Sequence, residues 1–327
     1  MGQTAAATVV ADVGGTNTRV ALAEGGQVRA GSIRRFTNAS AEGLEAILAS
    51  YLAEAGLDAP AGACVALAGP VQGDRAQMTN LGWHVTCDSL AQATGTGRVV
   101  LLNDLQAQGH ALDYLDPACL LTLRHGAPSE RDAARLVVGL GTGMNAAPVH
   151  RTPGGIFVPP SESGHVHLPQ HGPGESQLAR WLETNHGFAS VEDVLSGRGV
   201  ERLWQWHSLQ TGQESHRSAA QVMQALEAGD PIAQSVARSV IHSTARVLAS
   251  LALIHLPLGG IFLIGGVARA FAPWVNRFGF EEAFCDMGRF SDFVRDFPVH
   301  VVEDDFAALT GCASCLHAVL NAAPPTR

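Results

Sequence analysis

A short run from Ala11 to Arg19, with the sequence ADVGGTNTR, combines residue types that can hold a phosphate group and its metal ion. An apolar stretch typical of a strand leads into Asp12 and a diglycine turn, and Thr16 follows at once. Gly14 and Gly15 can adopt backbone angles barred to other residues and let main-chain N–H groups approach an anion, while Asp12 can hold Mg²⁺ directly or through water. A diglycine after a strand is also common as a plain tight turn, so the rest of the chain must decide.

A second glycine-rich run, GLGTGMN from Gly139 to Asn145, follows a strand-like stretch at Arg135–Val138. It does not match the dinucleotide fingerprint Gly-x-Gly-x-x-Gly, because Met144 stands where the third glycine is required. It suits a second phosphate turn, in which Gly141 allows close backbone approach and Thr142 adds a hydroxyl. Two such turns after two strands are much less frequent by chance than one, which favours a phosphate site.

A third glycine corner, GGVAR, follows the apolar run Ile261–Ile264. Gly265 and Gly266 carry no Cβ, so the adenosine end of a nucleotide can lie against the backbone there. Close packing of a helix on a strand is the alternative interpretation of this corner.

The strand-like run Val99–Leu102 ends in Asn103 and Asp104. Such a pair frequently caps the helix that follows, and this alternative stays open. In a kinase the same pair has a chemical role. Asp104 would accept the proton of an attacking hydroxyl, and Asn103 would hold a neighbouring hydroxyl through its amide.

Polar residues suited to sugar recognition follow in the segments SESGHVHLP and VEDVLSGRG. Carboxylates, amides and imidazoles pair with adjacent hydroxyls, so these segments and the Asn-Asp pair predict one sugar-binding set. Its members are Asn103, Asp104, Glu162, His165 and Glu192. His165 and His167 are an alternative pair of metal ligands, but no third ligand stands at a helpful spacing, which argues against structural zinc.

The length of 327 residues favours two lobes with a cleft between them. A net charge of -9 without basic clusters argues against nucleic acid as a partner. No signal peptide is visible, and the longest apolar stretch, near Val247–Leu258, is too short to span a bilayer, so we expect no membrane partner and a cytoplasmic protein. Six scattered cysteines suit reduced thiols.

Apolar runs of the kind found in covered sheets alternate with helical patterns, which predicts an α/β fold. Strands are expected at Thr8–Val13, Val99–Leu102, Arg135–Val138 and Ile261–Ile264, and a further strand is expected at Ala63–Ala68. Helices are expected after Gly174 above all, making the larger lobe helix-rich. The predicted helices are 41–57, 177–184, 192–195, 219–227, 231–256 and 307–322.

The set of motifs resembles that of the bacterial ATP-dependent glucokinases. The motifs that match, in the same order, are ADVGGTNTR, GPVQGD with MTNLGW, LLNDL, GLGTG, ESGHV, VEDVLSGRG and GGVA. They extend from Asp12 to about Gly311, nearly the whole chain. The resemblance implies the two-lobed actin-like, ribonuclease H-like ATPase fold with the active site between the lobes. The expected domains are 1–106 with 305–327, a small α/β domain, and 107–304, a large helix-rich α/β domain.

The resemblance also implies a role for each matched residue. Asp104 is the catalytic base. The remaining members of the sugar-binding set hold the sugar: Asn103, Glu162, His165 and Glu192. The residues that correspond to the cofactor-binding positions are Asp12, Gly14, Gly15 and Thr16 for the first phosphate turn, Gly141 and Thr142 for the second, and Gly265 and Gly266 near the adenosine. ATP and Mg²⁺ are the expected cofactors, and a homodimer is expected because the family tends to dimerise.

Two departures from the family pattern stand in this chain. Many members have a glycine on either side of the sugar-loop glutamate, whereas here Ser161 and Ser163 flank Glu162. Asn145 replaces a small residue that is common after the second phosphate turn. The cysteine-rich zinc motif of the related repressor, open reading frame and kinase family is absent from the sequence, which places the chain with the zinc-free glucokinases.

The expected reaction is transfer of the γ-phosphoryl group of ATP to the 6-hydroxyl of glucose, giving glucose 6-phosphate and ADP. A kinase for another hexose, such as mannose or N-acetylglucosamine, is an alternative, because the sequence does not size the space near the second carbon of the sugar. A non-catalytic sugar sensor is a further alternative. Polyphosphate or ADP as donor also stays open, because glycine turns recognise phosphates and not bases.

Overall fold

The structure, a computed structural model, describes residues 6–78 and 81–322. Contacts within the chain divide it into two compact units, the first comprising 1–116, 151–160 and 304–327 and the second 117–150 and 161–303. The domain boundary predicted after residue 106 falls inside helix α3 (Asp104–Ala111), which packs against the C-terminal helix α11 (Ala307–Asn321) within the first unit.

The sheet of the first unit has the strand order β3-β2-β1-β5-β9, with β4 paired to β2. The central strand β1 runs antiparallel to β2 and parallel to β5, which is parallel to β9 in turn. The strands are β1 (Thr8–Val13), β2 (Asn17–Glu24), β3 (Gln27–Val28), β4 (Arg34–Thr37), β5 (Ala63–Leu67) and β9 (Val99–Asn103). A second, three-stranded sheet contains β6 (Val71–Gln72), β7 (Arg75–Met78) and β8 (Trp83–Thr86).

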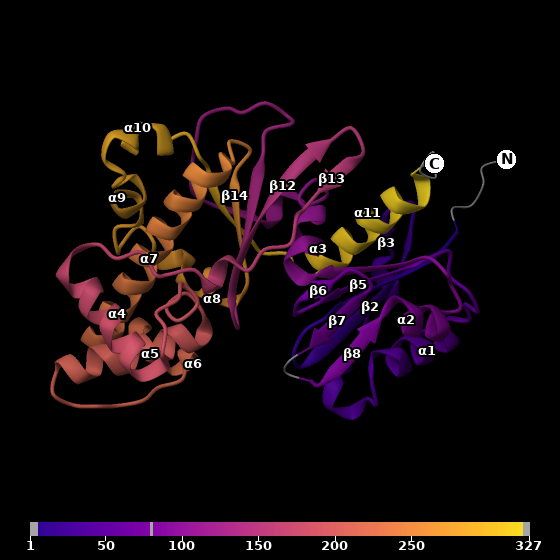
Figure 1. Ribbon diagram of the computed structural model, residues 1–327, viewed down its shortest axis with the longest axis horizontal. Helices are drawn as coiled ribbons and strands as arrows, with labels where there is room; N and C mark the ends of the chain where they lie inside the picture. The colour runs from indigo at the N-terminus through magenta and orange to yellow at the C-terminus, as the bar shows by residue number, and fades with distance from the viewer. Residues whose placement is uncertain (1–5, 79–80, 323–327) are drawn as a thin grey trace. The chain divides into compact units, whose positions relative to one another are not determined.

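Helices cover both faces of this first sheet (Figure 1). Helices α1 (Leu44–Ala55) and α2 (Cys87–Thr94) cover one face, where α1 buries its apolar side against the strands. Helices α3 and α11 cover the other face, and α11 buries a row of small side chains there, including Cys312 and Ala313. Because both faces are covered, the strands are near-continuous apolar runs, as the sequence predicts.

The large sheet that contains the strands of the second unit has the order β10-β15-β14-β11-β12-β13. Its central strand β11 runs antiparallel to β12 and parallel to β14, so it repeats the pattern of β1. The strands are β10 (Leu120–Arg124), β11 (Arg135–Leu140), β12 (Met144–Thr152), β13 (Gly155–Phe157), β14 (Ile261–Ile264) and β15 (Val299–Val302). The contacts assign residues 151–160, which include β13, to the first unit.

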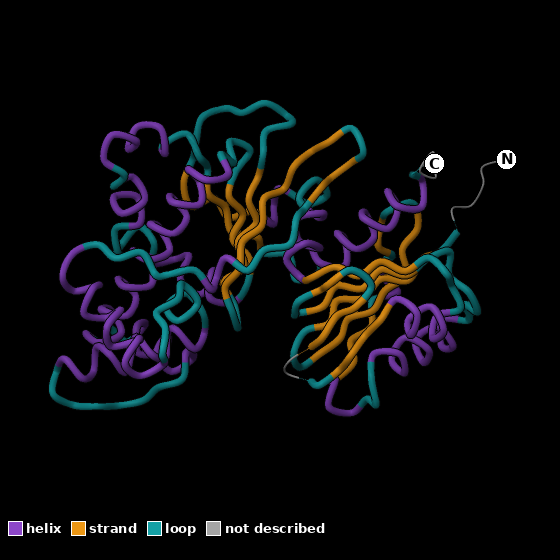
Figure 2. Tube along the Cα trace, in the orientation of Figure 1, coloured by secondary structure: helices purple, strands orange, loops and turns teal. Residues whose placement is uncertain are grey.

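Helices make up much of the second unit, as Figure 2 shows by colour. They are α4 (Gly172–His186), α5 (Gly197–Gln210), α6 (Ala219–Glu227), α7 (Pro231–His255), α8 (Gly266–Phe271), α9 (Phe280–Cys285) and α10 (Ser291–Val294). The longest, α7, starts where Asp230 accepts hydrogen bonds from two main-chain N–H groups of its first turn. One continuous apolar core joins these helices to the strands, with Trp204 fully enclosed.

The predicted strands and most predicted helices are confirmed, but the helix predicted at 192–195 is wrong. Residues 192–195 form turns, and α5 begins at Gly197 after Ser196, whose side chain accepts the N–H of Gly199. The main-chain N–H groups of Asp193 and Val194 donate three residues back, to Ser190 and Val191, which closes tight turns. The N–H groups of Val191 and Glu192 donate to Val166 and Gly164 and so attach the segment to the sugar loop. In the described part of the chain, no helix has the length and apolar character needed to cross a membrane.

Candidate active site

The first glycine turn is the tight connection between β1 and β2. The N–H of Gly14 donates to the carbonyl of Asn17 over 3.0 Å and closes the turn, which leaves Gly15 and Thr16 exposed at its tip. Gly14 does not use the left-handed region that glycine can adopt, because its φ lies outside that region. The missing side chain matters here for access to the backbone.

Asn38 supports this turn from behind, and sequence reasoning missed it. Its amide nitrogen donates to the carbonyl of Gly14 over 2.8 Å, and its amide oxygen accepts the hydroxyl of Thr18 over 2.8 Å. The main-chain N–H of Asn38 also donates to the carbonyl of Thr16. A buried amide with both ends bonded fixes the turn before any ligand binds. The only signal in the sequence is an isolated asparagine far from the motif.

Asp12 lies one residue before the end of β1, opposite Arg19 on β2. Burial raises the pKa of Asp12 above its usual range, while Arg19, 3.2 Å away, opposes that rise by its charge and its hydrogen bond. The Arg19 guanidinium also lies over the ring of Phe306, 5.8 Å from its centroid. A buried carboxylate of this kind is stabilised by a second cation, which makes it a reasonable partner for phosphate-bound Mg²⁺.

No cluster of three or more His, Cys, Asp or Glu side chains that would hold a metal ion by itself is found among residues 6–78 and 81–322. Mg²⁺ in phosphate-transferring sites takes most of its ligands from phosphates and water, with one or two carboxylates from the protein. Asp12 beside a glycine turn fits that requirement.

Asn103 and Asp104 stand at the same edge of the first sheet as this turn. In the parallel register Val13 lies opposite Leu67, which lies opposite Asn103. Two strand spacings, roughly 10 Å, therefore separate the ends of β1 and β9. The carboxylate of Asp12 and the Asn103-Asp104 pair thus gather at the carboxyl ends of parallel strands, where α/β sheets bind ligands.

The capping alternative for Asn103 is present in the structure. Its amide oxygen accepts the N–H of Gln106 over 2.6 Å, and the Gln106 side chain accepts the N–H of Asn103. The amide nitrogen is then the end of Asn103 that can donate to a sugar oxygen. Asp104 is the first residue of α3, is exposed, and accepts the N–H of Leu105 over 2.8 Å.

The second glycine turn joins β11 to β12 and is also held by hydrogen bonds to its backbone. The N–H of Gly141 donates to the carbonyl of Gly143 over 3.0 Å, and the carbonyl of Gly141 accepts the N–H of Gly197 over 2.8 Å. The latter bond attaches the turn to the first residue of α5. Thr142 is exposed at the tip, so its hydroxyl and the neighbouring backbone are open to a phosphate.

Glu192 is mostly buried beneath this second turn. One carboxylate oxygen accepts the N–H of Met144 over 2.9 Å, and the other lies 3.2 Å from the guanidinium of Arg198. The structure therefore gives Glu192 a supporting contact that the sequence did not reveal. Its contact with a sugar stays a prediction.

The sugar loop presents Glu162 and His165 side by side. Both side chains are more than half exposed, and the Nε2 atom of His165 lies 4.0 Å from a carboxylate oxygen of Glu162. Gly164 between them is buried against β12, where a Cβ would overlap the carbonyl oxygen of Met144. Its own carbonyl accepts the N–H of Glu192 over 2.9 Å. The loop, Glu192 and the second glycine turn thus form one connected structure.

The second glycine turn also lines a cavity of about 480 Å³. The third glycine corner enters the same cavity through Gly266, and the remaining lining is largely apolar, with Val200, Met223 and Phe271. Gly265 has φ of 105°, and a Cβ there would overlap the carbonyl of Leu140, so glycine is required at this corner. The packing alternative for the corner is therefore also present, beside an apolar cavity suited to a planar base.

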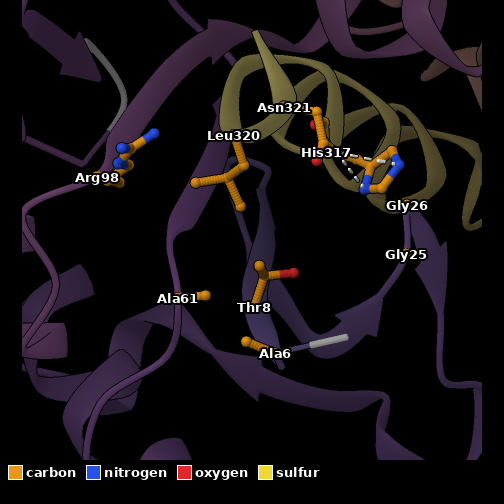
Figure 3. A pocket seen from close by; sticks show the side chains of 9 residues that line it. All are labelled: Ala6, Thr8, Gly25, Gly26, Ala61, Arg98, His317, Leu320 and Asn321. Atoms are coloured by element: carbon orange, nitrogen blue, oxygen red, sulfur yellow. Dashed lines mark hydrogen bonds between the residues drawn. The ribbon is translucent and has the colours of Figure 1, made fainter. Parts of the chain in front are cut away.

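Another cavity, of about 390 Å³, lies in the first unit and holds none of the predicted residues (Figure 3). It opens beside Thr8, at the beginning of β1, whereas Asp12 and the glycine turn stand at the end of that strand. Its polar side chains are Thr8, Arg98, His317 and Asn321, and Asn321 hydrogen-bonds the imidazole of His317. The cavity is therefore separate from the predicted chemistry.

Comparison with known proteins shows to which family the chain belongs. The sequence profile of the glucokinase family matches residues 9–319. Glucokinases of Cupriavidus metallidurans and Pseudomonas aeruginosa are each 32% identical to it, over 94% and 96% of this chain and 92% and 96% of theirs. The chain belongs to the glucokinase family. The predicted identification as a kinase of the glucokinase type is thereby confirmed.

Solved structures of glucokinases agree with this assignment. The glucokinase of an Antarctic psychrotroph superposes with a TM-score of 0.84 at 29% identity, covering 95% of this chain and 98% of that one. A ROK family glucokinase from Streptomyces griseus, solved with glucose and AMPPNP, has a TM-score of 0.63 at 20% identity, covering 94% and 98%, and shows the shared fold. The predicted actin-like α/β fold class is confirmed. Within the matched motif MTNLGW, Thr79 and Asn80 lie outside the described residues.

Proposed function

We propose that this member of the glucokinase family transfers the γ-phosphoryl group of ATP to the 6-hydroxyl of glucose, giving glucose 6-phosphate and ADP. One observation carries the proposal. In the second unit a single glycine turn, Gly141–Gly143, is connected to the predicted sugar loop through Glu192 and also lines an apolar cavity.

This arrangement suits phosphoryl transfer because the reaction needs acceptor, phosphates and nucleoside in sequence. Glu162 and His165 offer an exposed carboxylate and imidazole to sugar hydroxyls. Thr142 and the backbone of the turn would hold phosphate oxygens, and Gly266 with the apolar lining would accept the adenosine. The sugar-sensor alternative gives no reason for a nucleoside-sized cavity beside the phosphate turn.

The first unit would supply the charged groups. Asp104, exposed at the start of α3, would accept the proton of the 6-hydroxyl as phosphoryl transfer begins, and the amide nitrogen of Asn103 would donate to a neighbouring sugar oxygen. Gly14, Gly15 and Thr16 would bind phosphate through the exposed tip of their turn.

Mg²⁺, when bound to ATP, neutralises charge on the phosphates and on the group in transit. Asp12 would hold the ion directly or through water, and the charge and hydrogen bond of Arg19 oppose the rise in the pKa of Asp12 that its burial causes.

A coupled assay tests the proposal. Purified protein with Mg²⁺-ATP is given glucose, mannose, fructose or N-acetylglucosamine, and ADP and sugar 6-phosphate are measured. We expect glucose to be strongly preferred. Preference for another sugar would select the alternative hexose kinase. Absence of turnover with every sugar, repeated with polyphosphate and ADP as donors, would reject the kinase function and favour the sensor.

A homodimer and a cytoplasmic location are also part of the proposal. Light scattering coupled to size-exclusion chromatography would give the mass in solution, with about twice 34.2 kDa expected. A mass equal to one chain at assay concentration would reject the dimer. Fractionation of the source cells would test the location.

A further inference from the structure

The two departures from the family pattern touch each other. Asn145 stands two residues after Gly143, at the beginning of β12, while Ser161 and Ser163 flank Glu162 in the sugar loop. These positions are far apart in the motifs, yet their polar atoms form one local network. We refer to Asn145 with Ser163 as the loop clip.

Asn145 uses both ends of its amide in this network. The amide nitrogen donates to the carbonyl of Ser161, and the amide oxygen accepts the N–H of Ser163 over 3.0 Å. A side chain of this shape therefore bonds the backbone on both sides of Glu162. Glycine or alanine at this position would make neither bond.

Ser163 completes the clip in the opposite direction. Its hydroxyl oxygen accepts the N–H of Ala146 over 2.8 Å and lies 3.2 Å from the amide oxygen of Asn145. The hydroxyl also lies 3.3 Å from the carbonyl of Ala146. Side chains from the loop and from β12 thus each bond the other segment's backbone. Loss of Asn145 removes the side-chain partner of the Ser163 N–H, whereas loss of Ser163 leaves the Ala146 N–H with only the amide oxygen of Asn145, 2.8 Å away, as a side-chain acceptor.

We propose that the loop clip positions Glu162 and His165 for the sugar by fixing their loop to the strand that leaves the second phosphate turn. This inference rests on the proposed function, because it assigns Glu162 and His165 to sugar binding. Asn145 and Ser163 are positioning residues. Both Glu162 and His165 are exposed, so the backbone that carries them is what holds them in place.

The inference predicts an effect on sugar affinity before any effect on the phosphoryl donor. Without the clip the loop must be ordered when glucose binds, which lowers affinity for glucose. The second turn keeps its bonds to Glu192 and Gly197, so ATP binding is maintained. Loss of two backbone hydrogen bonds corresponds to about a tenfold change in the KM for glucose.

Steady-state kinetics of Asn145→Ala, Ser163→Ala and the double variant test this. We expect the KM for glucose to rise about tenfold in each single variant, while the KM for ATP stays within about twofold and kcat within about threefold. Because both residues act through one network, the double variant is expected to be no worse than the more affected single one. Ser163→Thr, which keeps the hydroxyl, should retain most of the affinity.

Ser176→Ala and Asn185→Ala are matched controls. Both residues lie on α4 in the same unit, and each makes an exposed hydrogen bond within its own helix. An unchanged KM for glucose in both clip variants would overturn the inference. So would effects that multiply in the double variant, or equal increases in both KM values together with a lowered melting temperature.

Hydrogen exchange separates failure of the clip from failure of the proposed function. In free protein, the amide of Ser163 is expected to exchange at least about tenfold faster in Asn145→Ala than in the wild type, whatever the substrate is. Unchanged exchange would reject the clip even in an active enzyme. A wild-type protein that shows the clip by exchange but does not phosphorylate glucose would reject the proposed function instead.

Discussion

The two glycine turns occupy the same place in the two sheets but are built differently. Each connects the central strand to its antiparallel neighbour, β1 to β2 in the first unit and β11 to β12 in the second. The first turn has a buried carboxylate before it and a buried amide, Asn38, behind it. The second turn has Glu192 behind it and an apolar cavity beside it.

The difference indicates that the two turns serve different functions, although the strands that carry them have the same arrangement in both sheets. In the proposed function, Asp12 and Asp104 at the edge of the first sheet would change or balance charge. The glycine backbone, the apolar cavity and the sugar loop of the second unit would recognise the shape of the substrates. Substitutions in the first unit should therefore reduce turnover, whereas substitutions in the second should reduce affinity.

The largest effect is expected at Asp104. Asp104→Ala should lower kcat by about 10³-fold, since a positioned base contributes about that much to proton transfer. Glucose affinity, measured by calorimetry, should change by less than about threefold because the base acts on the proton in transit. Asp104→Asn serves as the control that keeps a side-chain acceptor for Leu105. Near-normal turnover in both variants would remove Asp104 from its role.

A smaller effect is expected at Asp12. Asp12→Asn should lower kcat/KM for ATP by about 10²-fold and raise the Mg²⁺ concentration needed for half-maximal rate, because a charged group near the metal is lost. The free energy of unfolding should change by less than about 1 kcal/mol, since removing the partly exposed pair with Arg19 also removes the cost of burying a charge. Lost stability with unchanged kinetics would show that Asp12 is structural and would break the comparison.

Asn38 tests whether the support of the first turn matters for function. Asn38→Ala leaves the carbonyl of Gly14 and the hydroxyl of Thr18 without their partners, which should lower the free energy of unfolding by about 2 kcal/mol. The KM for ATP should rise several-fold. Asn185→Ala, at an exposed position, is the matched control for loss of an amide. Chemical denaturation and initial rates measure the two effects. Equal behaviour of the two variants would exclude a supporting role for Asn38.

The smallest effect concerns pH and involves one histidine in each unit. Burial lowers the pKa of His110 and of His207 to about 4. The unfolded chain takes up a proton on each as the pH falls below about 6.5 while the folded protein does not, so stability is lost between about pH 6.5 and 4. From pH 7.5 to 6 each should reduce the free energy of unfolding by about 1 kcal/mol.

Single substitutions check this in each unit separately. In urea titrations, the fall in the free energy of unfolding between pH 7.5 and 6 should be about 1 kcal/mol smaller in His110→Gln, and likewise in His207→Gln, than in the wild type. His216→Gln, at an exposed position, is the control. A pH dependence equal to that of the wild type in both variants would contradict the prediction.

The local sequence was sufficient to predict an element wherever the residues that determine its bounds lie within or next to that element. The strands Thr8–Val13 and Ile261–Ile264 have the predicted bounds because continuous apolar runs end at glycine or an acid. The helix 219–227 likewise has both its cap and its period in one stretch. Asp104 and Glu162 were selected by residue type, because chemistry restricts which side chains can serve, and their roles stay predictions.

Residues whose role depends on distant segments were not predictable. Asn38 supports a turn 24 residues earlier, and no local pattern distinguishes it from a surface asparagine. The segment at Glu192 has a helical composition, but hydrogen bonds to the sugar loop decide its conformation. Asn145 and Ser163 each read as a departure from a pattern, and only the structure shows that each accommodates the other.

Helix α11 bears on the order in which this protein can be completed during synthesis. It covers one face of the first sheet, burying Val10 and Cys64 of β1 and β5, yet it follows the entire second unit along the chain. A ribosome must therefore deliver about two hundred further residues after β9 before that face can be closed. The strand that carries Asp12 is among the first to be made, yet the face that includes its Val10 is among the last parts of the protein to be covered.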